Sequence, residues 1–311
     1  MISKAFVFID GIEDSLVVCG AVTLDTKKQY GEFRYGKSYL LRKDAIALDP
    51  LNLPLGSNIY TTTHQKGAFG VFLDAGADSW GQKVILSLHK TKPKNTLEFL
   101  LAGAGMGVGS LVFSLSSSAS KSKMNKNILG DIPMLLKAKD AILNDEQIPN
   151  EAKKAFEYGS SMGGARPKTT VSDGDITYLA KFNRSDDLFN HAKVEHASMN
   201  MLNELTCRVA TTKVLETDNG DVLLVERFDL LGARPTHHFM SANSLINLRS
   251  VNNSSLIERY SYGFLSEFIL KYSSVPDDAP ELFQRMVFNV LIGNTDDHTR
   301  NHAFLYSFKN K

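Results

Sequence analysis

A polar loop near the end of this chain separates two apolar runs, and it constrains the fold more than any other stretch. The loop reads Asn-Thr-Asp-Asp-His-Thr-Arg-Asn over residues 294–301. An Asp followed a few residues later by an Asn, between two buried segments, suits phosphoryl transfer, because the carboxylate can accept a hydroxyl proton and the amide oxygen can bind magnesium. The same residue types also favour an ordinary polar turn. The loop alone therefore leaves both interpretations open.

The composition indicates a soluble globular protein with room for two domains. Of its 311 residues, 43% are hydrophobic and 22% are charged. A net charge of +1 gives no general attraction to nucleic acid or to an anionic membrane. Cys19 and Cys207 have no metal-binding spacing, which indicates reduced thiols in the cytosol. Asp10 interrupts the first apolar run too early for a signal peptide, and no run is long enough to span a membrane, so we expect a cytoplasmic protein without membrane contact.

The first third of the chain predicts a mainly β module. Apolar or alternating segments predict strands at residues 4–9, 15–24 and 31–41. Residues 70–83 read as the end of a strand followed by a helix, with Asp78 or Ser79 as its N-cap. A glycine run at 103–109 does not fit Gly-x-Gly-x-x-Gly and follows a helical pattern, so we interpret it as a helix stop. The Ser-rich stretch at 114–122 then predicts the module boundary.

The second half places glycine, lysine and glutamate residues in an order typical of a protein kinase fold. After helices predicted at 132–143 and 151–158, the Gly- and Ser-rich residues 159–168 could cradle phosphate with backbone N–H groups, or form a flexible loop. A strand follows with Lys181 near its end, and Glu195 on the next helix could pair with that lysine or stay solvated. An apolar strand with a charged end and the Asp…Asn loop complete the order. Together these elements predict an α+β architecture.

Four segments resemble the HipA family of bacterial toxin kinases, in family order across nearly the whole chain. They are residues 33–40, residues 74–81 with Asp-Ser-Trp-Gly, residues 159–168 with Gly-Ser-Ser-Met-Gly-Gly-Ala-Arg-Pro-Lys, and residues 225–229 together with the loop at 294–301. The resemblance implies an α+β, protein-kinase-like fold of the HipA type. It implies an N-terminal, mainly β subdomain at 1–115, a linker and helix at 116–150, and a kinase domain at 151–311.

The same resemblance implies a function and partners. Family members are serine/threonine kinases of toxin–antitoxin modules that use ATP to phosphorylate a translation protein such as an aminoacyl-tRNA synthetase. A HipB-like, DNA-binding antitoxin neutralises them, so DNA would be met only indirectly, through that antitoxin. The expected cofactors are ATP and Mg²⁺.

Roles for individual residues follow from the resemblance. Nucleotide contacts would fall on Gly163, Gly164, Ala165, Arg166, Pro167, Lys168 and Lys181 at the phosphates, on Glu226, Arg227 and Phe228 at the adenine hinge, and on His298 and Asn301 in the catalytic loop. Asp296 would be the catalytic base and Asn301 the magnesium ligand. Ser161 falls where the family autophosphorylates, and a phosphate there would add about −2 charge beside the ATP loop and disarm the kinase.

The chain departs from the family pattern after residue 301. The strand at 303–308 is present, but the second strand, the metal-binding Asp and the further C-lobe helices of the family do not follow before Lys311. We therefore expect an incomplete C-lobe, impaired phosphoryl transfer, and an apolar strand without its hairpin partner. The alternative is a catalytically inactive protein that binds antitoxin or nucleotide. A test for phosphate transfer separates the two.

Overall fold

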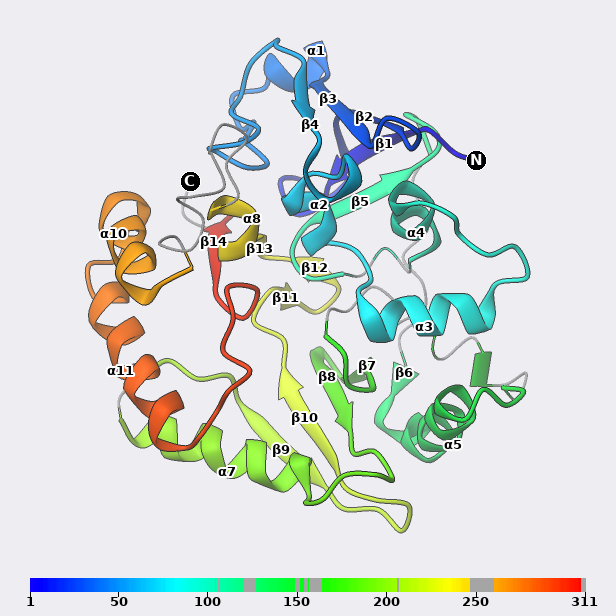
Figure 1. Ribbon diagram of the computed structural model, residues 1–311, viewed down its shortest axis with the longest axis vertical. Coiled ribbons are helices and arrows are strands. Elements are labelled where there is room, and N and C mark those ends of the chain that lie inside the picture. The colour runs from blue at the N-terminus through cyan, green and yellow to red at the C-terminus, as the bar shows by residue number, and fades with distance from the viewer. Residues whose placement is uncertain are drawn as a thin grey trace.

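Two five-stranded sheets form the frame of this protein (Figure 1). The computed structural model describes residues 1–103, 105, 107–119, 127–148, 152–153, 156, 164–205, 207–246 and 260–308. The first sheet lies near the N-terminus, the second lies toward the other end of the molecule, and helices α10 and α11 flank one side (Figure 1). Ser161, the expected autophosphorylation site, and Gly163, an expected contact of the ATP phosphates, lie outside the described residues.

The first sheet is antiparallel and runs in the order β4-β3-β2-β1-β5. Its strands are β1 (Lys4–Ile9), β2 (Val17–Asp25), β3 (Tyr30–Tyr35), β4 (Tyr60–Thr62) and β5 (Leu111–Ser114). The strand expected at 31–41 ends early, because Tyr39 lies in the short helix α1 (Lys37–Leu40) and donates its hydroxyl to the carbonyl of Ile46. The four-residue spacing from Tyr35 to Tyr39 suits a helical turn as well as a strand.

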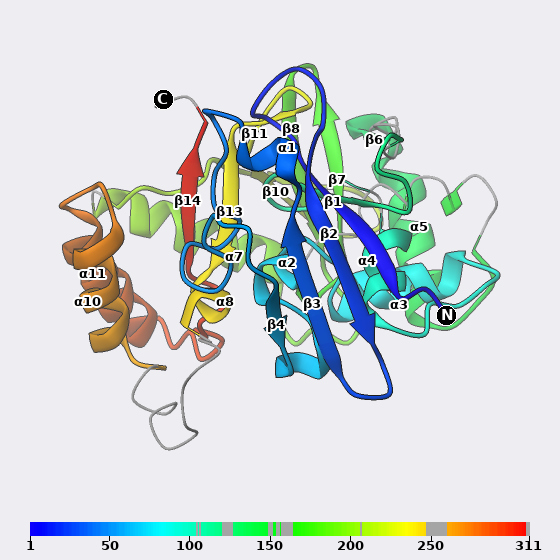
Figure 2. The ribbon, with the colours of Figure 1, turned by 90° about the horizontal axis from the view of Figure 1, so that it is seen from above.

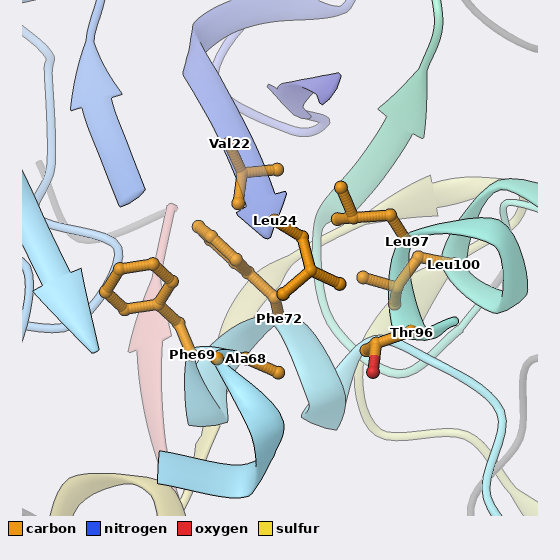
Figure 3. Close-up of a pocket in the computed structure, with 9 residues that line it drawn as sticks. Val22, Leu24, Ala68, Phe69, Phe72, Thr96, Leu97 and Leu100 are labelled. Carbon is orange, nitrogen blue, oxygen red and sulfur yellow. The ribbon is translucent and has the colours of Figure 1, made fainter. Parts of the chain in front are cut away.

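Short helices lie between β4 and β5 in the chain. They are η1 (His64–Lys66), α2 (Gly70–Asp74), α3 (Ser79–Leu88) and α4 (Thr96–Ala102). Residues of α2 and α4 are buried in the core of the first sheet, whereas Trp80 and Val84 of α3 are buried in the core of the second sheet. The strand end expected near residue 70 is therefore helical. A pocket between β2, α2 and α4 is lined by apolar groups and one hydroxyl, from Val22, Leu24, Gly67, Ala68, Phe69, Phe72, Thr96, Leu97 and Leu100 (Figure 3). Because this lining carries no charge, it offers nothing that would recognise a phosphate.

The second sheet runs in the order β6-β7-β8-β10-β9, parallel between β6 and β7 and antiparallel elsewhere. Its strands are β6 (Asn127–Ile128), β7 (Lys168–Asp173), β8 (Ile176–Phe182), β9 (Thr212–Leu215) and β10 (Val222–Glu226). Its helices are η2 (Leu129–Asp131), α5 (Ile132–Leu143) and α7 (His191–Glu204). Leu135 and Leu136 of α5 share a core with Tyr178 of β8 and Trp80 of α3. The segment expected as a separate linker and helix at 116–150 thus contributes β6 and α5 to this second module.

Among its described residues, the C-terminal part has two short strand pairs and three helices. Its elements are β11 (Leu230–Leu231), β12 (Arg234–Pro235), β13 (His237–Ser241), α8 (Ala242–Ile246), α10 (Tyr262–Tyr272), α11 (Asp278–Leu291) and β14 (Ala303–Ser307). β14 pairs antiparallel with β13 along its whole length, and the two lie side by side in Figure 2. β14 thus has a partner on one edge, from a segment far earlier in the chain, whereas the hairpin partner expected to follow it is not among the described residues.

The first core crosses the module boundary. Buried residues of the first sheet pack with Met240, Leu245 and Phe268 from the C-terminal part, and partly buried Phe304 of β14 packs against the same core. Gly70 of α2 lies so close to α8 that an added Cβ would approach the Ser244 side chain to 2.6 Å. The N-terminal module is thus built against the rest of the chain and has no separate core.

Buried polar contacts tie the same two parts together around His238. Its Nε2 lies 2.8 Å from the carbonyl oxygen of Leu48, and its Nδ1 lies 3.0 Å from the hydroxyl of Ser110. Because a carbonyl can only accept, Nε2 carries the proton and Nδ1 accepts the serine hydroxyl. The ring is fully buried. Nearby, Asp74 accepts hydrogen bonds of 2.8 Å from both the backbone N–H and the hydroxyl of Ser241.

We expect the stability of the protein to fall between about pH 6.5 and pH 4 because of His238. Burial lowers the pKa of this imidazole to about 4, although its hydrogen bond to Leu48 acts in the opposite direction. In this window the unfolded chain binds more protons than the native one, so the unfolding free energy rises with pH, by up to about 3 kcal/mol. Burial raises the pKa of Asp74, which acts in the opposite sense.

Urea unfolding at several pH values, compared with His238→Gln, measures this effect. Gln keeps a donor and an acceptor but does not titrate, and Asp74 contributes equally to both proteins. The unfolding free energy of the unsubstituted protein minus that of His238→Gln is expected to increase from pH 4 to pH 6.5 and then stay constant. Parallel curves would show that His238 does not titrate differently in the two states.

Candidate active site

A short loop leads into β7 and is held at both ends by Trp80. The backbone N–H of Trp80 donates to the carbonyl of Gly164 at 3.2 Å, and its indole Nε1–H donates to the carbonyl of Lys168 at 2.9 Å. Gly164 has a φ of +101°, and a Cβ there would lie 2.0 Å from Nζ of Lys168. Glycine is therefore required both by the backbone conformation and by the lysine that lies against it.

Two lysines lie opposite each other across β7 and β8. Lys168 pairs with Lys181 in the strand register, and Nζ of Lys181 lies 2.5 Å from a carboxylate oxygen of Glu195 on α7. Burial lowers the pKa of Lys168 to about 8, the charge of Lys181 acts in the same direction, and Asp78 and Glu195 oppose the shift. The structure thus places two positive side chains and one glutamate beside the glycine-containing loop. The Lys181–Glu195 pair, which the sequence left open against a solvated Glu195, is formed.

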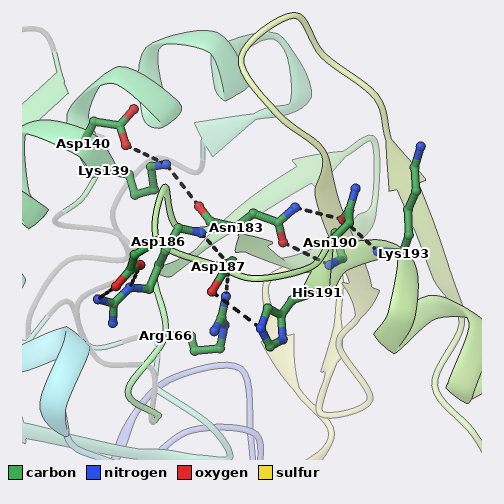
Figure 4. Close-up of polar contacts among 11 residues, drawn as sticks. Lys139, Asp140, Arg166, Asn183, Asp186, Asp187, Asn190, His191 and Lys193 are labelled. Atoms are coloured by element: carbon green, nitrogen blue, oxygen red, sulfur yellow. Dashed lines mark hydrogen bonds and ion pairs between the residues drawn. The ribbon is translucent and has the colours of Figure 1, made fainter.

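A polar network beside this loop engages Arg166 (Figure 4). Its guanidinium forms an ion pair with Asp187, whose carboxylate also accepts the N–H of Arg184 at 2.7 Å and lies 3.5 Å from Nε2 of His191. Burial would raise the pKa of Asp187, but the hydrogen bonds from Arg166 and Arg184 hold it below its usual range. Arg166, expected to cover the phosphates, is thus turned toward a carboxylate in this structure.

The segment expected as the adenine hinge follows β10. The N–H of Glu226 donates to the carbonyl of Thr211 and the N–H of Arg227 donates to the carbonyl of Thr177, each at 2.9 Å. Phe228 is 51% exposed. The backbone N–H groups of Glu226 and Arg227 are therefore both bonded within the protein. The exposed ring of Phe228 is the hinge group that faces solvent.

The side chain of Arg227 has a structural role. Its Nε and a terminal nitrogen donate to the two carboxylate oxygens of Asp229 at 2.9 and 2.6 Å, and a terminal nitrogen also donates to the carbonyl of Gly107. Asp229 in turn accepts the N–H of Gly109 at 2.8 Å. This buried pair therefore fastens Gly107 and Gly109 to the end of the strand.

The loop at 294–301 presents Asp296 to solvent. Its side chain is 86% exposed, and its Oδ1 lies 3.5 Å from Nε2 of His298. Asn301 donates its side-chain amide to the carbonyl of Asp296 and its backbone N–H to the carbonyl of His298, which closes the loop on itself. An exposed carboxylate and an amide oxygen in one small loop are oxygen donors of the kind that Mg²⁺ prefers alongside phosphates and water. Asp296 and Asn301 are therefore the oxygen donors that would hold the expected metal, and no group of three His, Cys, Asp or Glu residues that could hold one is found among the described residues.

The neighbouring Asp297 supports this loop. Its Oδ2 accepts hydrogen bonds from the hydroxyl of Tyr262 and, at 2.8 Å, from the amide of Asn289, and its Oδ1 lies 2.9 Å from Nε2 of His302. Its side chain is 15% exposed. The two adjacent aspartates thus differ, because Asp297 is engaged by three side chains and Asp296 is available for chemistry.

Contacts join the expected residues into two groups. The glycine loop, Lys168, Lys181 and Glu195 form one group around β7 and β8, and Asp296, His298 and Asn301 form the other between α11 and β14. Trp80, Asp187 and Asp297 were not expected to act in either group. Trp80 had a signal, the Asp-Ser-Trp-Gly segment, whereas Asp187 and Asp297 act through contacts that sequence spacing does not reveal.

Comparisons with known proteins match both halves of the chain. Residues 15–114 match the HipA N-terminal domain, and residues 160–311 match the HipA-like C-terminal domain. No curated protein matches. Within the part of the chain that the structure describes, no helix is long and apolar enough to cross a bilayer.

Two solved structures show how far the likeness extends. The chain is similar to a Shewanella oneidensis MR-1 structure of the toxin–antitoxin system HipA and HipB with operator DNA, with a TM-score of 0.64 and 17% identity over 96% of this chain and 72% of that one. At this identity the match establishes a shared fold, and it confirms the expected α+β fold of the HipA type. The Helicobacter pylori proinflammatory kinase CtkA matches with a TM-score of 0.38 and 20% identity over 48% of this chain and 50% of that one, too distant to add to the argument.

Proposed function

This chain belongs to the HipA family of toxins, and from that premise we propose that it is an ATP-dependent serine/threonine protein kinase of a toxin–antitoxin module. The observation that carries the proposal is the Lys181–Glu195 ion pair beside Lys168 and the glycine-containing loop. A lysine on a strand, paired with a glutamate on the following helix, is the arrangement that positions nucleotide phosphates in protein kinases. Surface ion pairs contribute little to stability, so this pair is better explained by positioning the lysine.

Each group has a role in this proposal. Lys181 and Lys168 neutralise phosphate charge, and the backbone between Gly164 and Lys168 covers the phosphates. Phe228 packs against adenine at the end of β10. Asp296 would accept the proton of the substrate serine or threonine hydroxyl, and Asn301 would help hold magnesium, which would supply charge neutralisation for phosphoryl transfer. Ser161 is the proposed autophosphorylation site.

The partners proposed are those of the family. A HipB-like antitoxin would bind the chain in the cytosol and carry it to operator DNA, in line with the HipA, HipB and DNA complex of the Shewanella protein. The substrate would be a translation protein of the aminoacyl-tRNA synthetase class.

Calorimetry with ATP and magnesium tests the nucleotide site. Lys181→Ala is expected to weaken ATP binding by about 10- to 100-fold, because it removes a charge-assisted hydrogen bond. Lys193→Ala, which removes an exposed lysine of α7 that pairs with Glu216 and Asp221, should not change it. Gly164→Ala should weaken ATP binding by displacing the Lys168 ammonium. Gly174→Ala is the matched control, because it also replaces a positive-φ glycine but its added Cβ has no atom within 4 Å.

Two results would change the proposal. No ATP binding at millimolar concentration to folded protein contradicts the nucleotide site. ATP binding without transfer of radiolabelled phosphate supports the inactive binding protein instead.

A further inference from the structure

We propose that Trp80 is a positioning residue for the phosphate-binding loop, so that the N-terminal module holds the nucleotide site of the second module in shape. The inference rests on the proposed ATP site. One residue of α3 donates to the first and last carbonyls of the five-residue segment from Gly164 to Lys168. Because each hydrogen bond fixes the direction of a peptide group, the two bonds together set the span and orientation of the arch between them.

The two modules meet at this contact. Trp80 lies within residues 15–114, which match the HipA N-terminal domain, and the loop lies within residues 160–311, which match the HipA-like C-terminal domain. Lys83, one turn further along α3, donates to the carbonyl of Leu143 at the end of α5 at 3.2 Å. The helix is therefore anchored to the second module at a point beyond the loop contact as well, and it can resist displacement of the loop.

A second group in the same turn acts on the lysine itself. Asp78 immediately precedes α3, and its charge acts on the ammonium of Lys168. Its Oδ1 is buried and has no hydrogen-bond partner among the described residues. The turn from Asp78 to Trp80 thus holds the backbone of Lys168 through the indole and faces its side-chain charge with a carboxylate.

Trp80 also fills space, so the test must separate packing from hydrogen bonding. The ring is 2% exposed and packs edge-on against Phe156, with centroids 6.0 Å apart. Trp80 is the single tryptophan of the chain. An analogue in which sulfur replaces the indole N–H, 3-benzothienylalanine, can therefore be incorporated at this position alone and keeps the size and shape of the ring. Trp80→Phe provides a second variant without the N–H.

Binding of ATP and of adenosine is measured by calorimetry for the unsubstituted protein and both variants. Loss of one neutral hydrogen bond should weaken ATP binding by about 2- to 10-fold, while adenosine, which has no phosphates, binds unchanged. Equal binding of ATP by all three proteins, or an equal loss for ATP and adenosine, overturns the positioning role. If the unsubstituted protein binds neither ligand, the proposed function itself fails.

Discussion

Replacing Asp229 with asparagine is expected to lower the unfolding free energy by about 3–5 kcal/mol, because it leaves a buried arginine without its carboxylate. The side chains of Arg227 and Asp229 are 4% and 1% exposed. Both carboxylate oxygens accept from Arg227, and one also accepts the N–H of Gly109. Asparagine has one acceptor oxygen and no charge, so it cannot replace either the bidentate contact or the neutralisation.

The chain contains a matched control for this change. Arg184 and Asp186 have the same Arg-x-Asp spacing, with two contacts of 2.8 Å, but their side chains are 41% and 65% exposed. Asp186→Asn is expected to change the unfolding free energy by less than about 1 kcal/mol. Urea unfolding followed by circular dichroism measures both variants. Similar losses for the two variants would mean that burial does not make the Arg227 pair important.

The sequence predicted elements well where the pattern is local. The helix expected at 132–143 is α5, and the strand expected to carry Lys181 near its end is β8. Both segments have strong apolar periodicity and clear flanking signals, so local propensity and burial favour the same element. The α+β order of the second half, and with it the family resemblance, depends on such segments.

Long-range pairing could not be predicted in this way. The partner of β14 is β13, a five-residue segment that lies before α8. Nothing in a short strand specifies which distant strand it will join, because register is set by the three-dimensional packing of both. The same limit applies to Trp80, whose motif was visible but whose contacts with Gly164 and Lys168 depend on how α3 packs against β7.

Prediction from the sequence was also limited where two adjacent residues have the same side chain. The family resemblance implied that Asp296 is the base, but no role followed from the sequence for the adjacent Asp297. The structure separates them by burial, because Asp297 is held by Tyr262, Asn289 and His302. Such a division of roles arises from contacts with α10 and α11, and it gives the second large prediction.

Asp296→Asn is expected to reduce phosphate transfer from ATP by about 10²- to 10⁴-fold, the range for loss of a general base. Because the Asp296 side chain is 86% exposed, the substitution should change the unfolding free energy of the protein by no more than about 0.5 kcal/mol. Transfer is measured as radiolabel incorporated into the protein from ATP, and stability by urea unfolding. A variant with full transfer would show that another group accepts the hydroxyl proton.

Asp297→Asn should behave in the opposite way toward stability. Asparagine cannot accept from Tyr262, Asn289 and His302 as an ionised carboxylate does, so the unfolding free energy should fall by about 2–3 kcal/mol. Transfer should fall too, because the loop that carries Asp296 loses its support. The residue that does the chemistry is the one whose variant loses transfer but keeps its stability. The residue that supports the loop is the one whose variant loses both. If Asp297→Asn is as stable as the unsubstituted protein and Asp296→Asn is not, the two assignments must be exchanged.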